Sequence, residues 1–345
     1  LAANAETSWF GFSQITAEMG DGVGTEYAGD ADNTDYGNTG LQFGADRIRI
    51  CYNASEGKAS AKLQIDFLKA GGPSIIKDAV VGYEMADAAK VSLGLFKTPV
   101  GMDFNGSGKK LDITKRGMEK SLVLERAMGA MFSGDLGGGL GYDVGVFNPT
   151  TRSGVVTTTT TDSDSTGVDS KNASGDGEDM AYAGRIRFDM DNLHLQASYG
   201  SSANAGAGDT DYHAAPDLYD TEDYTVMDLG AKYTMDPLTL KFEYIAGSNV
   251  RGVDGWDETV MFLHGGYMLN DSTEVVARHY MGTDDQNGTE TDLSNTYVGA
   301  NFFLNGAMRI QANYVMASGD TDGAYGGARG GYDSDAILTQ FQYTF

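Results

Sequence analysis

Seven basic side chains gather in the segment Lys97–Ala127, where only four acidic ones accompany them. The basic residues are Lys97, Lys109, Lys110, Lys115, Arg116, Lys120 and Arg126. Neighbouring ammonium and guanidinium groups attract anions, most strongly where low-dielectric surroundings weaken the screening by water. The segment also carries apolar residues that a solvated loop would not need, including Val100, Phe104 and Ile113. We therefore expect it to pack by one side against a wall and to present its basic groups to a narrow aqueous gap.

No other arrangement of residues points to catalysis or to a cofactor. The four histidines, His194, His213, His264 and His279, lack metal-ligand spacing, and no serine, cysteine or histidine arrangement suggests a nucleophile. Basic patches for nucleic acid are absent. The single cysteine, Cys51, excludes an internal disulfide framework. We predict that the chain is not an enzyme, needs no cofactor and binds no nucleic acid.

Alternation of apolar and polar residues with a period of two dominates the sequence. Thr239–Gly247 sets Leu240, Phe242 and Tyr244 against Lys241 and Glu243. Such alternation indicates strands with one apolar and one polar face. About sixteen strands long enough to cross a bilayer can be placed in this way, with about eighteen as the alternative. Their approximate starts are Ser8, Thr39, Lys58, Ile75, Ala89, Met128, Leu140, Met180, Leu193, Tyr224, Thr239, Thr259, Thr273, Asn295, Ala307 and Asp335.

The connections between these strands alternate in length. Short turns such as Gly137-Gly138-Gly139 and Asn270-Asp271-Ser272 follow every second strand, and most of the others are long, including Gly20–Asn38 and Gly282–Ser294. Short periplasmic turns, long outer loops and an even strand count are typical of bacterial outer-membrane barrels. The predicted fold is therefore all-β: a closed antiparallel transmembrane β-barrel.

The acidity of the chain is confined to one predicted end of this barrel. The net charge is −25. The long connections other than Lys97–Ala127, counted with the flanking residues Glu18 and Asp335, carry a net charge equal to that of the whole chain. Loose binding of Ca²⁺ by these acidic extracellular loops is one consequence to consider, because opposed carboxylates repel unless they are bridged. The plainer alternative is that acidic loops keep the surface soluble.

A second set of basic residues falls on the polar side of the alternation and is predicted to line the lumen. They are Arg47, Arg49, Lys62, Arg185, Arg187, Lys232, Lys241, Arg278 and Arg309. Rings of lysine and arginine favour anions in a pore. Alternatively these bases pair with lumen acids such as Asp66, Asp189, Asp228 and Glu243, which would leave the pore unselective.

Three stretches resemble the Gram-negative outer-membrane porins, in particular the phosphate-selective porins and related general porins. They are Gly94–Gly101, Glu125-Arg126 and Tyr142–Asn148. Phe345, which ends a run of alternating aromatic residues, is similar to the terminal recognition signal of outer-membrane barrels. The resemblance implies a homotrimer of barrels, each constricted by its third external loop, which here is Lys97–Ala127. The sequence departs from the phosphate-selective members in its acidic approach and in Ala127-Met128-Gly129-Ala130, where a further arginine would be expected.

The expected function is passive diffusion of small polar solutes and ions across the outer membrane, with a basic constriction that favours anions. Ala3-Asn4-Ala5 fits the cleavage pattern of an export signal. Residues 1–5 are therefore expected to be a remnant of a signal peptide, and residues 6–345 a single barrel surrounded by lipid and lipopolysaccharide. Two alternatives stay open: a barrel that sheathes or scaffolds a partner protein, and a secreted β-rich adhesin.

Overall fold

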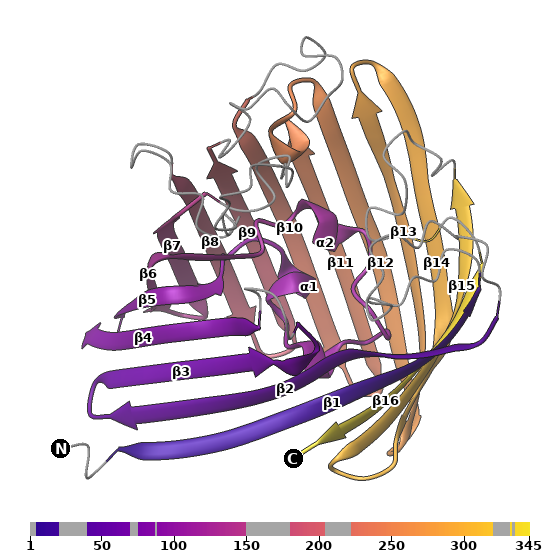
Figure 1. The fold of residues 1–345 in the computed structure, drawn as a ribbon, viewed down its shortest axis with the longest axis horizontal. Coiled ribbons are helices and arrows are strands. Elements are labelled where there is room, and N and C mark those ends of the chain that lie inside the picture. The colour runs from indigo at the N-terminus through magenta and orange to yellow at the C-terminus, as the bar shows by residue number, and fades with distance from the viewer. Residues whose placement is uncertain are drawn as a thin grey trace, which may run out of the picture.

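The computed structural model describes residues 5–20, 40–69, 75–86, 88–149, 180–203, 222–319, 332 and 335–345 (Figure 1). Sixteen strands account for most of this part of the chain. They are β1 (Glu6–Gly20), β2 (Gln42–Glu56), β3 (Ala59–Asp66), β4 (Ile76–Ala86), β5 (Ala89–Lys97), β6 (Arg126–Gly137), β7 (Leu140–Phe147), β8 (Ala181–Met190), β9 (Leu193–Ser202), β10 (Tyr224–Met235), β11 (Leu238–Ser248), β12 (Trp256–Asn270), β13 (Thr273–Gln286), β14 (Thr289–Phe303), β15 (Met308–Gly319) and β16 (Ala336–Thr344).

In the part of the chain that the structure describes, only short helical turns accompany the strands. They are η1 (Phe67–Lys69), α1 (Met102–Asn105), η2 (Gly108–Lys110), α2 (Glu119–Leu122) and η5 (Val250–Gly252). No helix in the described ranges is both long enough and apolar enough to cross a membrane.

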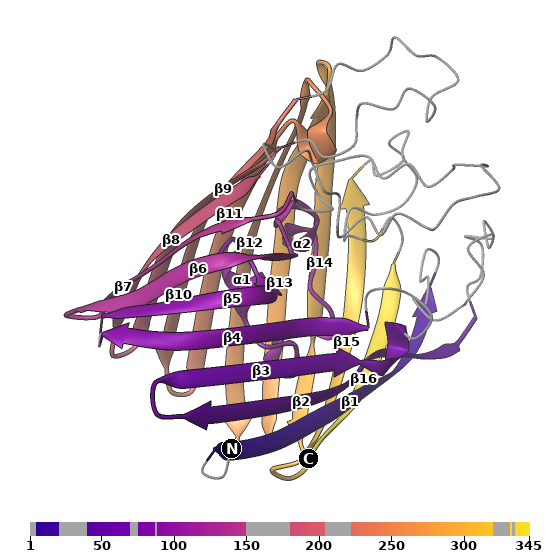
Figure 2. The same ribbon diagram turned by 60° about the vertical axis from the view of Figure 1, so that its left-hand side comes forward.

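The strands form a closed antiparallel barrel in which each pairs with its neighbours along the chain. Closure is made by β1, which pairs with β2 on one edge and with β16 on the other. A sheet in lipid has no water to satisfy an open edge, so closure is what the surroundings require. The predicted fold class and strand number are confirmed. The start of β1 at Glu6 and the C-terminal residue Phe345 lie at the end of the barrel that carries the short turns (Figure 2).

The short turns lie where the sequence places them. Between β6 and β7, Gly137, Gly138 and Gly139 all have positive φ (87°, 62° and 85°), a conformation that glycine adopts without steric cost. The predicted long connection Gly282–Ser294 is wrong. There β13 and β14 continue as a hairpin and are joined by Asn287-Gly288, both with positive φ, as a two-residue hairpin turn requires. The connection Ser248–Glu258 is also shorter than predicted, because it contains η5 and β12 already begins at Trp256.

Apolar side chains on the outward face of the strands form a belt around the barrel. Ile186, Leu240, Leu263 and Phe341 are among the exposed large side chains of this belt. Their neighbours in sequence, such as Glu243 and Gln340, are buried on the inner side. A lipid-facing surface requires this arrangement, in which the apolar residues point outward and the polar residues inward.

Phe345 closes the seam between the two ends of the chain. Its backbone N–H donates to the Gly11 carbonyl at 3.0 Å, and the Gly11 N–H donates to the Phe345 carbonyl at 2.9 Å. The phenyl ring covers Gly11 so closely that a Cβ there would lie 2.3 Å from the ring. The ring itself is more than half exposed on the outer face.

We predict that Phe345→Asp prevents stable insertion of the barrel, whereas Phe345→Tyr is tolerated. A charge on the lipid face costs about 2–4 kcal/mol at the midplane and less near the interface. The fraction of heat-modifiable folded protein on gel electrophoresis measures the effect. Equal folded fractions for the aspartate and tyrosine variants would contradict the prediction.

Candidate functional site: the loop inside the barrel

The segment between β5 and β6 leaves the wall and returns to it at one point. Lys97, the last residue of β5, is opposite Arg126, the first residue of β6. The Thr98 N–H donates to the Glu125 carbonyl at 2.9 Å and closes the base of the loop. Between these points the chain forms α1, η2 and α2, which lie inside the barrel (Figure 1).

The apolar side of this loop packs on the inner wall. Val100, Leu122, Val123 and Leu124 are fully buried. They belong to one core cluster with aromatic wall residues, among them Tyr224, Phe262 and Tyr280. On β9, Gly200 provides the space, because a Cβ there would lie 2.5 Å from Leu124 Cδ1 and 3.1 Å from Val100 Cγ2.

The polar side is held by side chains of the wall that bind the loop backbone. Arg309 Nη1 and Gln311 Nε2 donate to the Leu111 carbonyl at 2.9 and 3.1 Å, and Asn301 Nδ2 donates to that of Asp112 at 2.9 Å. Further amides complete the series: Gln14 binds Gly108, Gln342 binds Lys109, and Asn313 and Gln340 bind Thr114. A buried loop would otherwise leave its carbonyl and amide groups without partners, which is costly.

A cluster of four buried charges anchors the middle of the loop. Asp103 and Asp112 come from the loop, and Lys241 and Arg278 from β11 and β13. Arg278 Nη2 lies 3.1 Å from Asp112 Oδ2 and 3.4 Å from Asp103 Oδ1, and Lys241 Nζ binds Asp112. Burial alone would raise the pKa of both carboxyls, but the two cations outweigh it and hold each pKa below its usual value. Both carboxylates therefore stay charged in any ordinary solution and keep the loop attached.

Both ends of α1 are bound by the side chains of ionisable residues. The carboxylate of Glu243 on β11 accepts the N–H groups of Met102 and Asp103 at 2.8 and 2.9 Å. At the other end, Lys97 Nζ donates to the carbonyls of Phe104 and Gly106 at 2.5 and 2.9 Å. Arg116 Nη2 donates to the same two carbonyls, at 3.2 and 2.7 Å. Lys97 and Arg116 thus share the same two carbonyl partners at this point.

The other predicted loop bases have different surroundings. Lys115 pairs with Glu18 on β1, with 2.7 Å between Nζ and Oε1, and Arg126 pairs with Asp78 on β4 at 2.9 Å. Lys109 Nζ lies over the Phe10 ring, 4.5 Å from its centroid. Lys110 lines a cavity of about 270 Å³ between the loop and β13–β16, and Lys120 is half-buried on α2.

All nine predicted wall bases lie on the lumen side of their strands, and most have partners. Arg49 pairs with Asp66, Lys62 with Asp78, and both Arg185 and Arg187 with Asp143, while Arg187 also pairs with Asp135. Lys241 and Arg278 belong to the four-charge cluster, Arg309 binds the loop, Arg47 donates to Gln14, and Lys232 is half-buried on β10.

Of the four acids expected as partners of these bases, only Asp66 forms such a pair. Asp189 binds His194, Asp228 accepts from Gln196 and Ser198, and Glu243 binds α1.

Sequence reasoning missed the amide side chains that hold the loop. Gln311, Asn313, Gln340 and Gln342 occupy the inward positions of β15 and β16. The repetition of glutamine and asparagine at alternate positions of these two strands is the sequence feature that could have indicated them. The acidic loop residues for which Ca²⁺ was considered lie largely outside the described ranges, so that idea stays a prediction.

The comparisons with known proteins agree with this geometry. Residues 19–267 and 274–345 match the sequence profile of the family described as phosphate-selective porin O and P. The chain belongs to this family. No curated protein matches the porin significantly.

Solved outer-membrane channels share its fold. The porin is 12% identical to OmpT of Vibrio cholerae, covering 100% of this chain and 99% of that one with a TM-score of 0.66. It is 14% identical to an anion-selective porin from Comamonas acidovorans (99% and 100% covered, TM-score 0.64). It is 12% identical to the channel DcaP of Acinetobacter baumannii (100% and 99% covered, TM-score 0.65). Family and fold together identify an outer-membrane channel for passive diffusion of small polar solutes, rather than an enzyme.

We predict that deleting Gly106–Arg116 raises the single-channel conductance and admits larger polymers. The deletion removes the stretch that crosses the lumen from α1 to the wall of β13–β16. Conductance in planar bilayers, with polymers of graded size, measures the change. The heat-modifiability of the variant on gels serves as the control for folding. A folded variant with the conductance of the parent would show that this stretch does not narrow the pore.

Proposed function

We propose that the porin prefers anions and that the loop 97–127 forms its constriction. The observation that supports this most directly is that single carboxylates of the wall each bind two cations. Asp78 lies within 2.6 Å of Lys62 Nζ and 2.9 Å of Arg126 Nε, and Asp143 within 2.7 Å of Arg185 and 2.8 Å of Arg187. The group of Lys62, Arg126 and Asp78 leaves a net positive charge on the wall, whereas at Asp143 the charges balance, because Arg187 also pairs with Asp135 at 2.9 Å.

Arg116 adds to this excess. Its hydrogen-bond partners are backbone carbonyls, which orient a cation without neutralising it. The loop makes hydrogen bonds or ion pairs with every strand from β9 to β16 and with β1 and β2. The wall from β3 to β8, with its paired arginines, therefore borders the part of the lumen that the loop leaves uncovered. Basic rings at such a point favour anions.

The acidic outer loops act in the opposite direction. They concentrate cations at the mouth, but their influence fades as the Debye length falls to about 3 Å at 1 M salt. Charges at a narrow gap are screened less, so the constriction dominates at high salt. The family description names phosphate and one structural relative is described as anion-selective. Both agree with a preference for anions in this chain. A sheath for a partner protein would need an unobstructed lumen, which the packed loop does not leave.

We predict that Arg116→Gln shifts the reversal potential toward cations in a gradient of concentrated KCl. Glutamine can still donate to the carbonyls at the end of α1, so the change removes charge while keeping a donor. Lys58→Gln in the turn between β2 and β3 is the matched control, because Lys58 lies at the rim and outside the constriction. An unchanged reversal potential in the Arg116→Gln variant would refute the role of this cation.

We further propose that the porin is exported with cleavage before Glu6, inserts among lipid and lipopolysaccharide, and assembles as a homotrimer. OmpT of Vibrio cholerae, which shares the fold, has been solved in a trimer form. The apolar belt provides an outward surface that could meet either lipid or a neighbouring barrel.

We predict that chemical crosslinking of the porin in outer membranes yields a ladder that ends at three subunits. Closed point-group assemblies stop at a defined number, so species above the trimer should not accumulate. A pattern of monomers alone, obtained with a crosslinker that joins a known trimeric porin in the same membranes, would contradict the proposal.

A further inference from the structure

A cavity of about 550 Å³ lies on the lumen side of β1–β5, toward the end with the short turns. Hydroxyl and amide groups form much of its lining: Ser8, Asn53, Ser55, Ser60 and Ser92. Val80 and Phe96 add an apolar surface. Such a combination, a partly apolar hollow with a few polar groups, is what binding sites for small solutes have in common.

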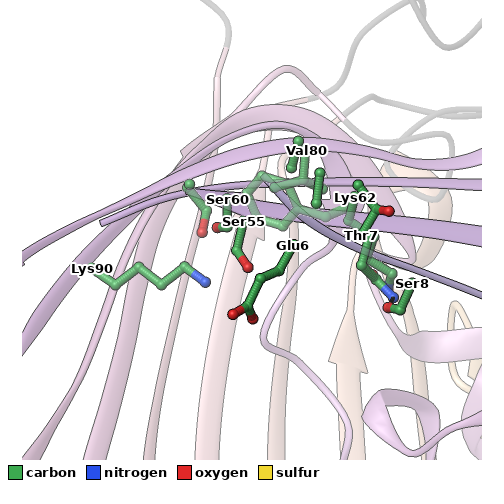
Figure 3. A pocket seen from close by; sticks show the side chains of 14 residues that line it. Glu6, Thr7, Ser8, Ser55, Ser60, Lys62, Val80 and Lys90 are labelled. Atoms are coloured by element: carbon green, nitrogen blue, oxygen red, sulfur yellow. Dashed lines mark hydrogen bonds between the residues drawn. The ribbon is translucent and has the colours of Figure 1, made fainter. Parts of the chain in front are cut away.

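Two opposite charges point toward each other across this cavity. Figure 3 shows the ammonium of Lys90, from β5, and the carboxylate of Glu6, from β1, directed into the same space. Within the described residues neither side chain takes part in an ion pair or hydrogen bond. The other cation of the cavity, Lys62, is occupied by Asp78 at 2.6 Å. The cavity therefore presents one available ammonium and one available carboxylate.

The direction of the Lys90 side chain depends on the neighbouring strand, β4. In register, Lys90 is opposite Glu84 on β4, yet its side chain leans over Gly82 instead. A Cβ at Gly82 would lie 2.8 Å from Lys90 Cε and 2.7 Å from Ser60 Oγ. The absence of a side chain at Gly82 thus lets the ammonium extend along β4 toward the cavity.

We infer that this cavity is a subsite for small zwitterionic solutes that carry hydroxyl groups, such as hydroxylated amino acids. An anion would be attracted by Lys90 and repelled by Glu6. A cation would be attracted by Glu6 and repelled by Lys90. Neither kind of ion therefore gains much binding free energy. A solute with both charges can form a charge-assisted hydrogen bond at each end, while the serines accept or donate to its hydroxyl. The subsite lies apart from the end of α1 and requires only the pore itself, so it stands or falls independently of the anion preference.

The test is the block of KCl conductance by L-serine in planar bilayers. Two analogues dissect the requirement: 3-hydroxypropionate lacks the ammonium and ethanolamine lacks the carboxylate. L-serine should reduce the conductance at concentrations where neither analogue does. Glu6→Gln and Lys90→Gln should each raise the half-blocking concentration about tenfold, the usual weight of one charge-assisted hydrogen bond. Gly82→Ala should weaken the block without any change of charge, because it displaces the Lys90 side chain.

Matched controls separate a site from a general effect of charge. Glu84→Gln removes a carboxylate next to Lys90 in register, and Lys58→Gln removes an ammonium from the adjacent turn, but neither residue lines the cavity. Both variants should be blocked like the parent. The inference is overturned if L-serine does not block the parent, if either analogue blocks as well as L-serine, or if the controls shift the block as much as Glu6→Gln and Lys90→Gln do.

Discussion

The structure depends on one constraint: every backbone polar group must find a partner on a barrel whose outside is in lipid. Pairing of β1 with β16 satisfies the edges of the sheet, and outward apolar residues such as Ile186 and Leu263 face the lipid. The strict alternation then sends polar side chains inward. A lumen lined in this way can hold an irregular segment, because its wall supplies donors and acceptors that an apolar core could not.

The loop 97–127 uses both kinds of surface that this lumen offers. Its apolar residues pack against the aromatic side chains of β10–β13, and its backbone binds amide side chains from β14–β16 and β1. Neither set would suffice alone. An apolar contact without the amides would bury unpaired carbonyls, and amide contacts without packing would leave the loop in exchange with water. The four-charge cluster fixes the point at which the two surfaces meet.

The sequence predicted the barrel well because period-two alternation is a local property. Most predicted strand starts lie within about three residues of the observed ones, the accuracy expected of such boundaries. The prediction errs where paired strands no longer show alternation of apolar and polar residues. The upper parts of β13 and β14 carry Asp284, Asp285, Glu290 and Asp292 and still pair, because strands that rise above the bilayer no longer need an apolar face. Their polarity therefore resembled that of a loop.

The candidate site was predictable in part for a related reason. Composition alone identified the loop as basic and partly apolar, and the resemblance supplied its inward course. Its partners could not be predicted, since contacts such as that between Leu111 and Arg309 join residues far apart in sequence. From the sequence, the wall bases could pair with lumen acids. Of the acids expected there as partners, only Asp66 forms such a pair, with Arg49. The alternation along a strand assigns a residue to the lumen, but it does not identify the charged residue with which that residue pairs.

The arrangement of charges follows from the position of the loop. On the side that it covers, Lys241 and Arg278 meet two carboxylates and the charges balance. On the other side the arginines must be held rigidly to line a passage, since a mobile side chain would obstruct it. A full set of carboxylates would hold them but cancel their field. One carboxylate shared between two cations, as at Asp78, fixes both cations by charge-assisted interactions and leaves half of their charge uncompensated. At Asp143 a second acid, Asp135, binds Arg187 and completes the balance. At Asp78, rigidity and net positive charge are thus obtained from the same three residues, and this acid cannot be removed without releasing two cations at once.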